Sequence, residues 1–472
     1  MRKTEKTKTY HLVSLGCAKN TVDSQSMAQL LSRSGYQAVE KPGRADVLIV
    51  NTCGFIGPAK EESLQVLGEL AAHKRKGQVL IAAGCLTQRY GLEVARQVAG
   101  IDGILGTRRW MDIVDVVQQL RHTGHPEPVY HLPEAATVGV DERETQRVAV
   151  QGASAYIKIA DGCRRPCAFC AIPQIKGTAV SRSEGAVLSE ALALQEMGVR
   201  ELVLIAQDTT DYGHDLGVRD GLAGLLENMA AALSAAQDRH RSSSDGVAWI
   251  RLLYAFPGYV TDRLIEVMAT TPQIVPYLDM PLQHAHPATL QRMRRPANLD
   301  WVHRTLEKMR LAMPDLALRT TFIVGYPGET DQEFQALLDF VREVRFDRVG
   351  AFKFSFEPGT TSEPLGDPVP AEVKQERWER LMALQQSISL EKNQAFVGRT
   401  LPVLIEGQGD GISLGRTYRD APEIDGLVIV EGELPVGEMI PVRIQGAMTY
   451  DLAGVVETNC AVILNDPIEI SR

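Results

Sequence analysis

DGCRRPCAFC, at residues 161–170, holds three cysteines separated by three and two residues: Cys163, Cys167 and Cys170. The stretch follows AYIKIA, which has the apolar character of a buried strand. A four-iron four-sulfur cluster usually takes four cysteines, so three thiolates leave one iron open to another ligand. Structural zinc is the alternative, but it requires four ligands and no fourth lies near this loop. We therefore interpret the loop as the binding site of an iron–sulfur cluster with one open iron.

Three further cysteines, Cys17, Cys53 and Cys85, each close an apolar run. The runs YHLVSLGC, ADVLIVNTC and GQVLIAAGC alternate with helical segments such as SQSMAQLLSRSG, a pattern typical of a parallel α/β domain. Because the carboxyl ends of parallel strands lie at one edge of the sheet, these cysteines are expected to converge there. The alternative is that three ordinary core cysteines end three strands, but three in the same topological position favour a shared site.

The composition indicates a soluble globular protein of 472 residues with two to four domains and ample core. No apolar run reaches the length of a membrane span, and MRKTEKTKTYH at the N-terminus does not resemble a secretory signal. We expect a cytoplasmic protein with no membrane partner, in which reduced cysteines are metal ligands or catalysts. The net charge of −9 favours a protein or small-molecule substrate over nucleic acid.

The predicted fold class is α/β, with a parallel α/β domain, a central barrel and a small C-terminal β-barrel. Strands of the central part are predicted at AYIKIA, ELVLIAQD, WIRLLYAF, LDMPLQ, LRTTFIVG and RVGAFKFS, which fits a full or partial (β/α) barrel. Strands of the last part are predicted at RTLPVLIEG, LVIVEGEL, MIPVRIQGA and DLAGVVE, which fits a barrel of the OB type. The predicted boundaries are residues 8–125, a linker at 126–150, the central domain at 151–394 and the β-barrel at 395–460.

The spacing C-x3-C-x2-C, with Phe169 before its last cysteine, resembles the signature of the radical S-adenosylmethionine enzymes. The resemblance implies that Cys163, Cys167 and Cys170 hold a four-iron four-sulfur cluster whose open iron is chelated by S-adenosylmethionine. It also implies that an electron from the cluster cleaves the sulfonium to give a 5′-deoxyadenosyl radical. The cluster thus both anchors the cofactor and donates the electron.

The same resemblance implies several cofactor-binding residues. Phe169 would lie near the adenine, and Gln207, with its neighbour Asp208, occupies the place where the family contacts the methionyl amino group. The segment TFIVGYPGET matches the glycine-rich stretch that lines the cofactor, and its relevant residues are Gly325, Pro327 and Gly328. Beyond the cluster ligands, no catalytic residue is assigned.

The arrangement of the whole chain is similar to that of the radical methylthiotransferases. The resemblance includes SLGCAKN, NTCGFI, AAGCL, the compact triplet, YLDMPLQH and GYPGET. It implies that Cys17, Cys53 and Cys85 hold a second open four-iron four-sulfur cluster, which carries or binds the sulfur to be inserted. It further implies a C-terminal TRAM domain and an electron donor such as flavodoxin or ferredoxin.

Two features favour a protein substrate over RNA. Residues 397–457 contain four arginines and no lysine against ten acidic residues, whereas an RNA-binding barrel usually carries a positive face. In addition, GRTYRDAPEIDG resembles the barrel signature of the ribosomal-protein branch, the RimO-like enzymes. The implied reaction is methylthiolation at the β-carbon of an aspartate in the small-subunit ribosomal protein S12, a basic partner that an acidic surface would attract.

Two other functions remain open at this point. The first is a methylthiotransferase that acts on adenosine in transfer RNA, with the same chemistry but a nucleic-acid partner. The second is a non-catalytic iron–sulfur or zinc protein that uses its acidic barrel as a binding module. Of the remaining residues, His284 and His286 are expected to contact substrate or to be structural, Arg182 has no assigned substrate contact, and Cys460 is expected to be a spare thiol.

Overall fold

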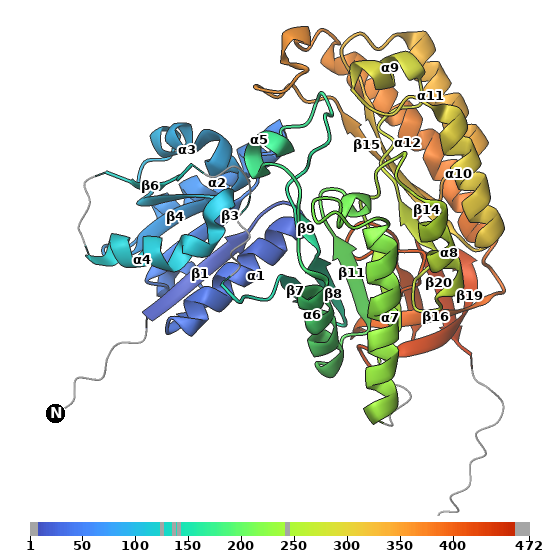
Figure 1. Cartoon of the computed structure of the whole chain (residues 1–472), viewed down its shortest axis with the longest axis horizontal. Helices are drawn as coiled ribbons and strands as arrows, with labels where there is room; N and C mark the ends of the chain where they lie inside the picture. Colours follow the sequence, from blue (N-terminus) through green and yellow to red (C-terminus); the bar gives the residue numbers. More distant parts are fainter. Residues whose placement is uncertain (1–7, 123–126, 135–137, 139–142, 241–245, 458–472) are drawn as a thin grey trace, which may run out of the picture. The chain divides into compact units, whose positions relative to one another are not determined.

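The computed structural model of the chain describes residues 8–122, 127–134, 138, 143–240 and 246–457 (Figure 1). The chain divides into two compact units, Met1–Gln385 and Gln386–Arg472, which meet within the long helix α12 (Ala371–Gln394). Cys460 and the basic N-terminal segment lie outside the described residues. No helix in the described part of the chain is long and apolar enough to cross a membrane.

The first part of unit 1 is a six-stranded, wholly parallel sheet in the order β2-β1-β3-β4-β5-β6. Its strands are β1 (Lys8–Ser14), β2 (Tyr36–Ala38), β3 (Val47–Thr52), β4 (Val79–Gly84), β5 (Gly103–Gly106) and β6 (Val129–His131). Alternate residues of β3 enter two different cores, Val47 and Ile49 on one face and Leu48 and Val50 on the other. Burial of both faces explains why the sequence shows continuous apolar runs here.

Helices cover both faces of this sheet, as Figure 1 shows for α1 and α3. The elements are α1 (Ala18–Arg33), η1 (Pro42–Arg44), α2 (Gly57–Ala72), α3 (Cys85–Gln97), η2 (Thr107–Asp112) and α4 (Ile113–His122). Helix α1 begins six residues before the predicted segment SQSMAQLLSRSG. The first turns of α1 bury polar side chains, including Lys19, Asn20 and Asp23, so they lack the apolar period that marks a helix in sequence.

The second part of unit 1 is a partial barrel made of two sheets. Strand order is β12-β11-β8-β7 in one sheet and β13-β14-β15 in the other, and an isolated bridge between Ile250 and Ile274 lies near their junction. The strands are β7 (Val148–Gln151), β8 (Ser154–Lys158), β11 (Glu201–Ile205), β12 (Trp249–Leu252), β13 (Tyr277–Asp279), β14 (Ala317–Val324) and β15 (Arg348–Lys353). Among the described strands, β15 pairs only with β14, so the predicted barrel is open.

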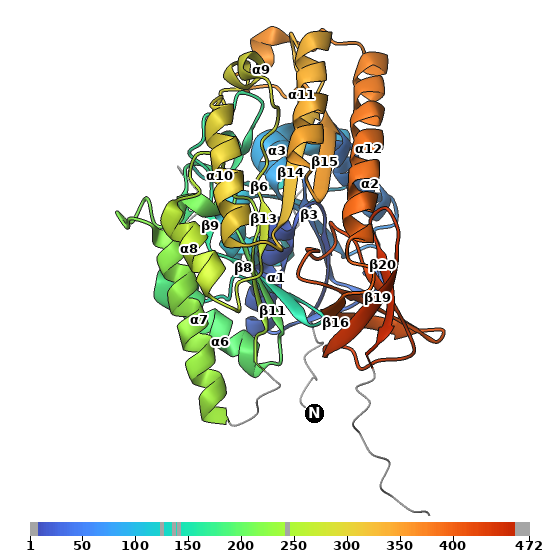
Figure 2. The same cartoon turned by 90° about the vertical axis from the view of Figure 1, so that its right-hand side faces the viewer.

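The remaining elements of this part surround the two sheets. They are β9 (Ala160–Asp161), β10 (Val180–Ser181), α5 (Ile172–Lys176), α6 (Glu184–Glu196), η3 (Thr209–Asp211), α7 (Gly221–His240), α8 (Asp262–Thr270), α9 (Pro287–Arg292), α10 (Leu299–Ala312), α11 (Asp331–Val344) and η4 (Glu363–Leu365). Figure 2 shows α10, α11 and α12 side by side over β14 and β15. Helix α11 starts at a capping box in which Thr330 and Glu333 satisfy each other's backbone N–H groups.

Two strands lie in or next to the segment predicted to be a linker. Strand β6 extends the N-terminal sheet, and β7 pairs in antiparallel fashion with β8 of the partial barrel. Both are edge strands of three or four residues, too short to give a periodic signal.

Unit 2 contains a closed five-stranded β-barrel in the order β16-β17-β18-β20-β19. Its strands are β16 (Thr400–Gly409), β17 (Ile412–Arg416), β18 (Val428–Glu431), β19 (Met439–Ala447) and β20 (Leu452–Val456). No strand was predicted at β17. This strand follows β16 after a tight turn at Asp410 and Gly411, both of which have a positive φ. Two of the barrel's four arginines, Arg416 and Arg419, are buried.

Candidate functional site

Both groups of three cysteines line one cavity of about 400 Å³ in unit 1. Its walls are rich in aromatic side chains, namely Phe55, Phe169, Tyr254, Phe256 and Phe352. The six thiols are free, and no disulfide joins them. Segments that are far apart in the sequence therefore open into one mostly apolar chamber.

The dispersed triplet (Cys17, Cys53 and Cys85) comes from three neighbouring strands. Cys17 follows β1, Cys53 follows β3 and Cys85 follows β4, and these strands are adjacent in the sheet. The chain leaves β1 for β2 on one side and returns to β3 on the other, which makes the β1–β3 boundary the topological switch point where ligands of such sheets bind. The three cysteines therefore lie together at one edge of the sheet, as predicted from the sequence.

Glycines beside these cysteines allow the loops to approach closely. A Cβ on Gly16, whose φ is +89°, would lie 2.8 Å from Cys53 Cβ and 3.0 Å from Cys53 Sγ. A Cβ on Gly54 would lie 2.5 Å from the backbone of Leu86, and Gly84 has a φ of +105°. A side chain at any of these glycines would therefore clash or be strained where the three cysteine loops meet.

The compact triplet (Cys163, Cys167 and Cys170) is shaped by its own loop and by donors around it. Cys163 N donates to Gly177 O at 3.0 Å, and Arg165 N donates to Cys163 Sγ at 3.4 Å. Arg295 Nη1 donates to Cys167 Sγ at 3.6 Å. Hydrogen bonds to sulfur of this kind tune iron–sulfur clusters, so the loop is suited to holding one.

Burial raises the pKa of thiols in both triplets, and Cys17 is the exception. Burial raises the pKa of Cys163 to about 11 and that of Cys170 to about 12. Burial likewise raises the pKa of Cys85 to about 12 and also raises that of Cys53. For Cys17, which solvent reaches through the cavity, burial acts in the same direction, but Lys19, Lys176 and backbone N–H groups outweigh it and lower the pKa.

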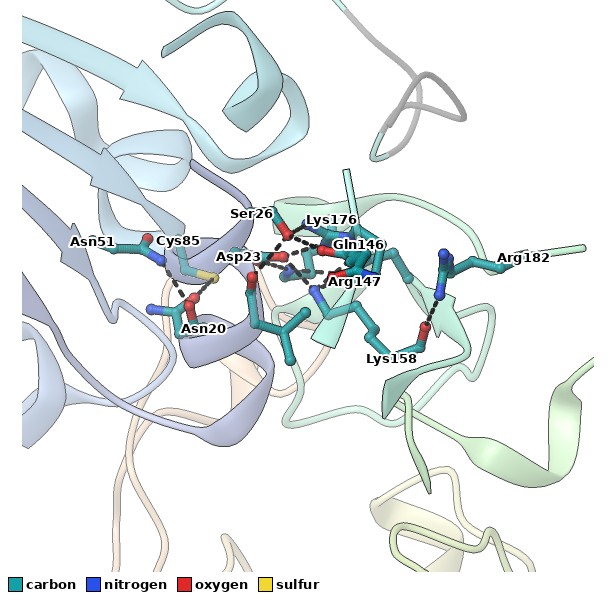
Figure 3. A network of polar contacts seen from close by, with 12 residues as sticks. Asn20, Asp23, Ser26, Asn51, Cys85, Gln146, Arg147, Lys158, Lys176 and Arg182 are labelled. Carbon is teal, nitrogen blue, oxygen red and sulfur yellow. Dashed lines mark hydrogen bonds and ion pairs between the residues drawn. The ribbon is translucent and has the colours of Figure 1, made fainter. Parts of the chain in front are cut away.

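A buried ionic network lies around Asp23, and Figure 3 shows it together with Cys85 of the dispersed triplet. Asp23 of α1 accepts from Arg147, from Lys158 at 2.5 Å and from Lys176 at 3.0 Å. Asp161, two residues before Cys163, accepts from the same three cations at 3.1 Å each. The network joins the helix that follows Cys17 to the loop that carries the compact triplet.

This network is almost closed to solvent, with four of its five side chains no more than 2% exposed. Burial opposes ionisation of Asp23, but Lys158, Lys176 and Arg147 hold the pKa of that carboxyl far below its usual range. Burial, together with Lys176 and Arg147, lowers the pKa of Lys158 to about 8, although both aspartates act against this shift. Two carboxylates therefore face three cations, and the removal of either carboxylate would leave uncompensated buried charge.

Only some of the predicted cofactor-binding residues line the cavity that holds the cysteines. Phe169 and Gln207 line the cavity, whereas Asp208 is buried and pairs with Arg165 at 2.6 Å. Gly325, Pro327 and Gly328 are not among the residues that line it. A Cβ on Gly325 would meet Lys374 at 2.4 Å, and Gly328 O accepts from Arg292, so this turn packs against α9 and α12. Their role in cofactor binding remains a prediction.

Other residues singled out in the sequence have internal partners. His284 is completely buried, with Nε2 3.2 Å from Glu329 and Nδ1 accepting from His286 N. Arg182 is buried and forms two hydrogen bonds of 2.7 Å with Glu190. Among the described side chains, no three or more of His, Cys, Asp and Glu are placed to hold a single metal ion. The fit to iron–sulfur clusters therefore rests on the shared cavity, the glycines and the N–H···S bonds.

A second, larger cavity of about 840 Å³ adjoins the first. The two share Phe55, Phe169, Gln283, Thr321 and Phe352 in their walls. The larger cavity extends along β15, whose Phe352 is half exposed and whose outer edge has no strand partner among the described residues.

Lys19, Tyr254 and Arg295 are among the cavity residues that were not predicted from the sequence. Lys19 lies within the motif SLGCAKN, but only the cysteine of that motif was interpreted. Arg295 Nε is buried and has no hydrogen-bond partner. Neither Tyr254 nor Arg295 has a sequence signal, because each reaches the cavity from a loop far from either triplet.

Three family models match successive parts of the chain. Residues 9–106 match the uncharacterized protein family UPF0004, residues 157–341 the radical SAM superfamily and residues 397–456 the TRAM domain. These matches confirm the three-part α/β fold with a C-terminal β-barrel.

Curated relatives match over nearly the whole length. The chain is 52% identical to the ribosomal protein uS12 methylthiotransferase RimO of Chloroflexus aurantiacus, covering 94% of this chain and 99% of that protein. It is 48% identical to the protein of the same name from Herpetosiphon aurantiacus, with the same coverage. Among solved structures it is similar to the radical S-adenosylmethionine methyltransferase TsrM of Kitasatospora setae. That match has a TM-score of 0.57 and 12% identity over 85% of this chain and 79% of that one, which shows a shared fold alone.

Proposed function

This chain belongs to the RimO family of ribosomal protein uS12 methylthiotransferases, and from that premise we propose that it methylthiolates the β-carbon of an aspartate in uS12. It is an enzyme, a transferase of the radical S-adenosylmethionine type that uses an iron–sulfur cluster and S-adenosylmethionine. The observation that carries the detailed proposal is that both cysteine triplets face one cavity. A reaction that needs hydrogen removal and sulfur delivery at one carbon requires both functions within reach of it.

Each triplet, in this proposal, holds one four-iron four-sulfur cluster with an open iron. The cluster on Cys163, Cys167 and Cys170, when bound, supplies the electron that cleaves S-adenosylmethionine, and the cluster on the dispersed triplet supplies the site that holds sulfur. The chain itself orients the compact loop through Arg165 N and Arg295 Nη1, which donate to Cys163 and Cys167. A flavodoxin or ferredoxin is the class of electron donor that such a cluster requires.

The cavity walls present mostly apolar surface to the proposed reaction chamber. Phe169, Phe256 and Phe352 present aromatic surface to the chamber, and Gln207 adds an amide that donates and accepts hydrogen bonds. A largely apolar chamber suppresses side reactions with water and strengthens each polar contact made within it. The adjoining 840 Å³ cavity is the proposed path for the uS12 segment.

The surface of the β-barrel in unit 2 supports a protein partner. Its exposed acidic residues are Asp410, Glu423, Glu431, Glu433, Glu438 and Glu457, whereas its only exposed basic residues in the described range are Arg399 and Arg443. Burial of Arg416 and Arg419 leaves these six exposed acidic side chains against two exposed basic ones, so the outer face is acidic. Such a face attracts a basic protein and repels the RNA backbone.

Comparison of a deletion strain with its parent tests the proposal. Mass spectrometry of uS12 should show loss of a methylthio group from one aspartate, while 2-methylthio nucleosides in transfer RNA stay at parental levels. Complementation with the wild-type chain should restore the mark. An unchanged uS12 together with loss of the nucleoside modification would instead assign the enzyme to transfer RNA.

A further inference from the structure

The charges on the wall of the cysteine cavity are all of one sign. Four basic side chains line it, Lys19, Arg165, Lys176 and Arg295, and no aspartate or glutamate is among its described lining residues. A buried cation usually has a carboxylate partner, because burial of unpaired charge is costly. The partners of these four cations therefore show which of them has no oxygen acceptor in the described part of the chain.

Two of the four cations already have carboxylate partners, and a third is held by a carbonyl oxygen and a thiol. Arg165 pairs with Asp208 at 2.6 Å, and Lys176 pairs with Asp23 and Asp161. Arg295 donates to Pro281 O and to Cys167 Sγ, so its guanidinium is held against the compact triplet. Lys19 differs, since none of the described residues gives its ammonium a hydrogen-bond acceptor or a carboxylate.

Lys19 lies in the first turn of α1, two residues after Cys17, and is only 7% exposed. Its Nζ is 3.2 Å from the centroid of the Tyr254 ring, a cation–π contact between the N-terminal sheet domain and the partial barrel. The ring holds the ammonium at the cavity wall but leaves its N–H groups without an oxygen acceptor. The position is thus formed by residues from two domains and faces the chamber that both triplets share.

The backbone conformation of Tyr254 holds its ring against Lys19. Its φ is +64°, a left-handed conformation that is unusual for an aromatic residue. Tyr254 N donates to the completely buried Asp279 at 3.0 Å, and Tyr254 O accepts from Thr209 N at 3.1 Å. Strain of this kind persists where surrounding structure enforces it, often at ligand-binding sites.

We propose that Lys19, supported by Tyr254, binds the carboxylate of the substrate aspartate. The inference rests on the proposed function and deepens it by naming the residue that recognises the reacting side chain. A carboxylate on Lys19 Nζ forms a charge-assisted hydrogen bond and supplies the oxygen acceptor that this lysine lacks. The β-carbon is one bond from the carboxylate carbon, so it lies near the dispersed triplet, which is the proposed sulfur site. Adenosine carries no carboxylate for such a site.

Binding of uS12 to the reconstituted holoenzyme tests this role without turnover. The dissociation constant is measured anaerobically with S-adenosylmethionine and no reductant, for uS12 and for uS12 whose target aspartate is changed to asparagine. Wild-type enzyme should bind the aspartate form about 10–100-fold more tightly, the range of a buried charge-assisted hydrogen bond. The Lys19→Met variant should lose that preference and bind both forms within about threefold of each other.

Lys60→Met is the matched control, because Lys60 also lies over a tyrosine ring, Tyr90, but faces Glu93 and does not line the cavity. It should keep the wild-type preference. Iron content and 5′-deoxyadenosine formation without uS12 report whether Lys19→Met still assembles the clusters.

Two results would overturn the inference while leaving uS12 as the substrate. The wild-type enzyme could bind both uS12 forms equally, or Lys19→Met could weaken both equally and keep the preference, as a structural or cluster-neutralising role would require. Absence of any uS12 binding by the wild-type enzyme would contradict the proposed function itself.

Discussion

The two cysteine triplets of this protein are built by different means. The compact triplet needs one loop of ten residues, Asp161–Cys170, whereas the dispersed triplet needs three adjacent strands and the glycines at their ends. Their electrostatic surroundings differ at one position. Lys19, Lys176 and backbone N–H groups lower the pKa of Cys17. Burial raises the pKa of the other shifted thiols in both triplets, Cys53, Cys85, Cys163 and Cys170. A ligand set encoded in one loop tolerates changes elsewhere in the fold, and a set assembled by a sheet does not.

Separate removal of the two triplets should have the largest effect. Replacement of Cys163, Cys167 and Cys170 by alanine should leave about half the iron and abolish 5′-deoxyadenosine formation. Replacement of Cys17, Cys53 and Cys85 should also leave about half the iron but retain 5′-deoxyadenosine formation, with no methylthio transfer. Iron and sulfide analysis, together with chromatography of 5′-deoxyadenosine, distinguishes the two variants. Loss of all iron from either variant would show that the two sites do not assemble independently.

Gly16→Ala should damage the dispersed triplet alone. Its Cβ would lie 2.8 Å from Cys53 Cβ, and its φ of +89° is unfavourable for alanine. We expect loss of close to half the iron, with 5′-deoxyadenosine formation retained. Gly35→Ala is the control, since Gly35 has a similar φ of +82° and nothing within 4 Å of its added Cβ. Equal iron loss in both variants would mean that backbone strain, and not the approach of the two loops, is responsible.

Asp23→Asn should have a smaller effect, on stability, because it removes one of the two carboxylates that face three buried cations. We expect the free energy of unfolding to fall by about 3–5 kcal/mol at pH 7. Anaerobic denaturant titration of the holoenzyme measures it, and Lys308→Ala, which breaks the exposed pair with Asp262, should change it by less than about 0.5 kcal/mol.

The penalty of Asp23→Asn should also depend on pH. The folded-state pKa of Asp23 lies far below its unfolded value, so the stabilisation is fully present above about pH 4 and is lost progressively as the pH falls from there toward the folded-state pKa. The difference between wild type and variant should shrink by up to about 1.4 kcal/mol per pH unit below pH 4. A difference that stays constant from pH 7 to pH 3 would mean that Asp23 is not ionised in the folded protein.

Sequence reasoning located most of the strands but fewer of the features that make the site. Parallel strands carry long apolar runs, which is why β1, β3, β4 and, apart from β7, the strands of the partial barrel were predicted. Strands β6 and β7 were not predicted because they are short edge strands of three and four residues. The start of α1 was not predicted because it buries polar side chains, among them Asp23 of the ionic network. Neither feature produces a period of apolar residues in the sequence.

The sequence by itself determined the compact triplet, the three-part fold and the family, since these depend on spacing within loops and on the period of apolar residues. Only the tertiary structure decided that the two triplets share one cavity, that five charged residues from separated segments form a buried network, and that Lys19 lies over Tyr254 without a carboxylate. The physical reason is that a side chain's partners depend on which segments the fold brings within a few ångströms. Spacing along the chain fixes that distance only for near neighbours.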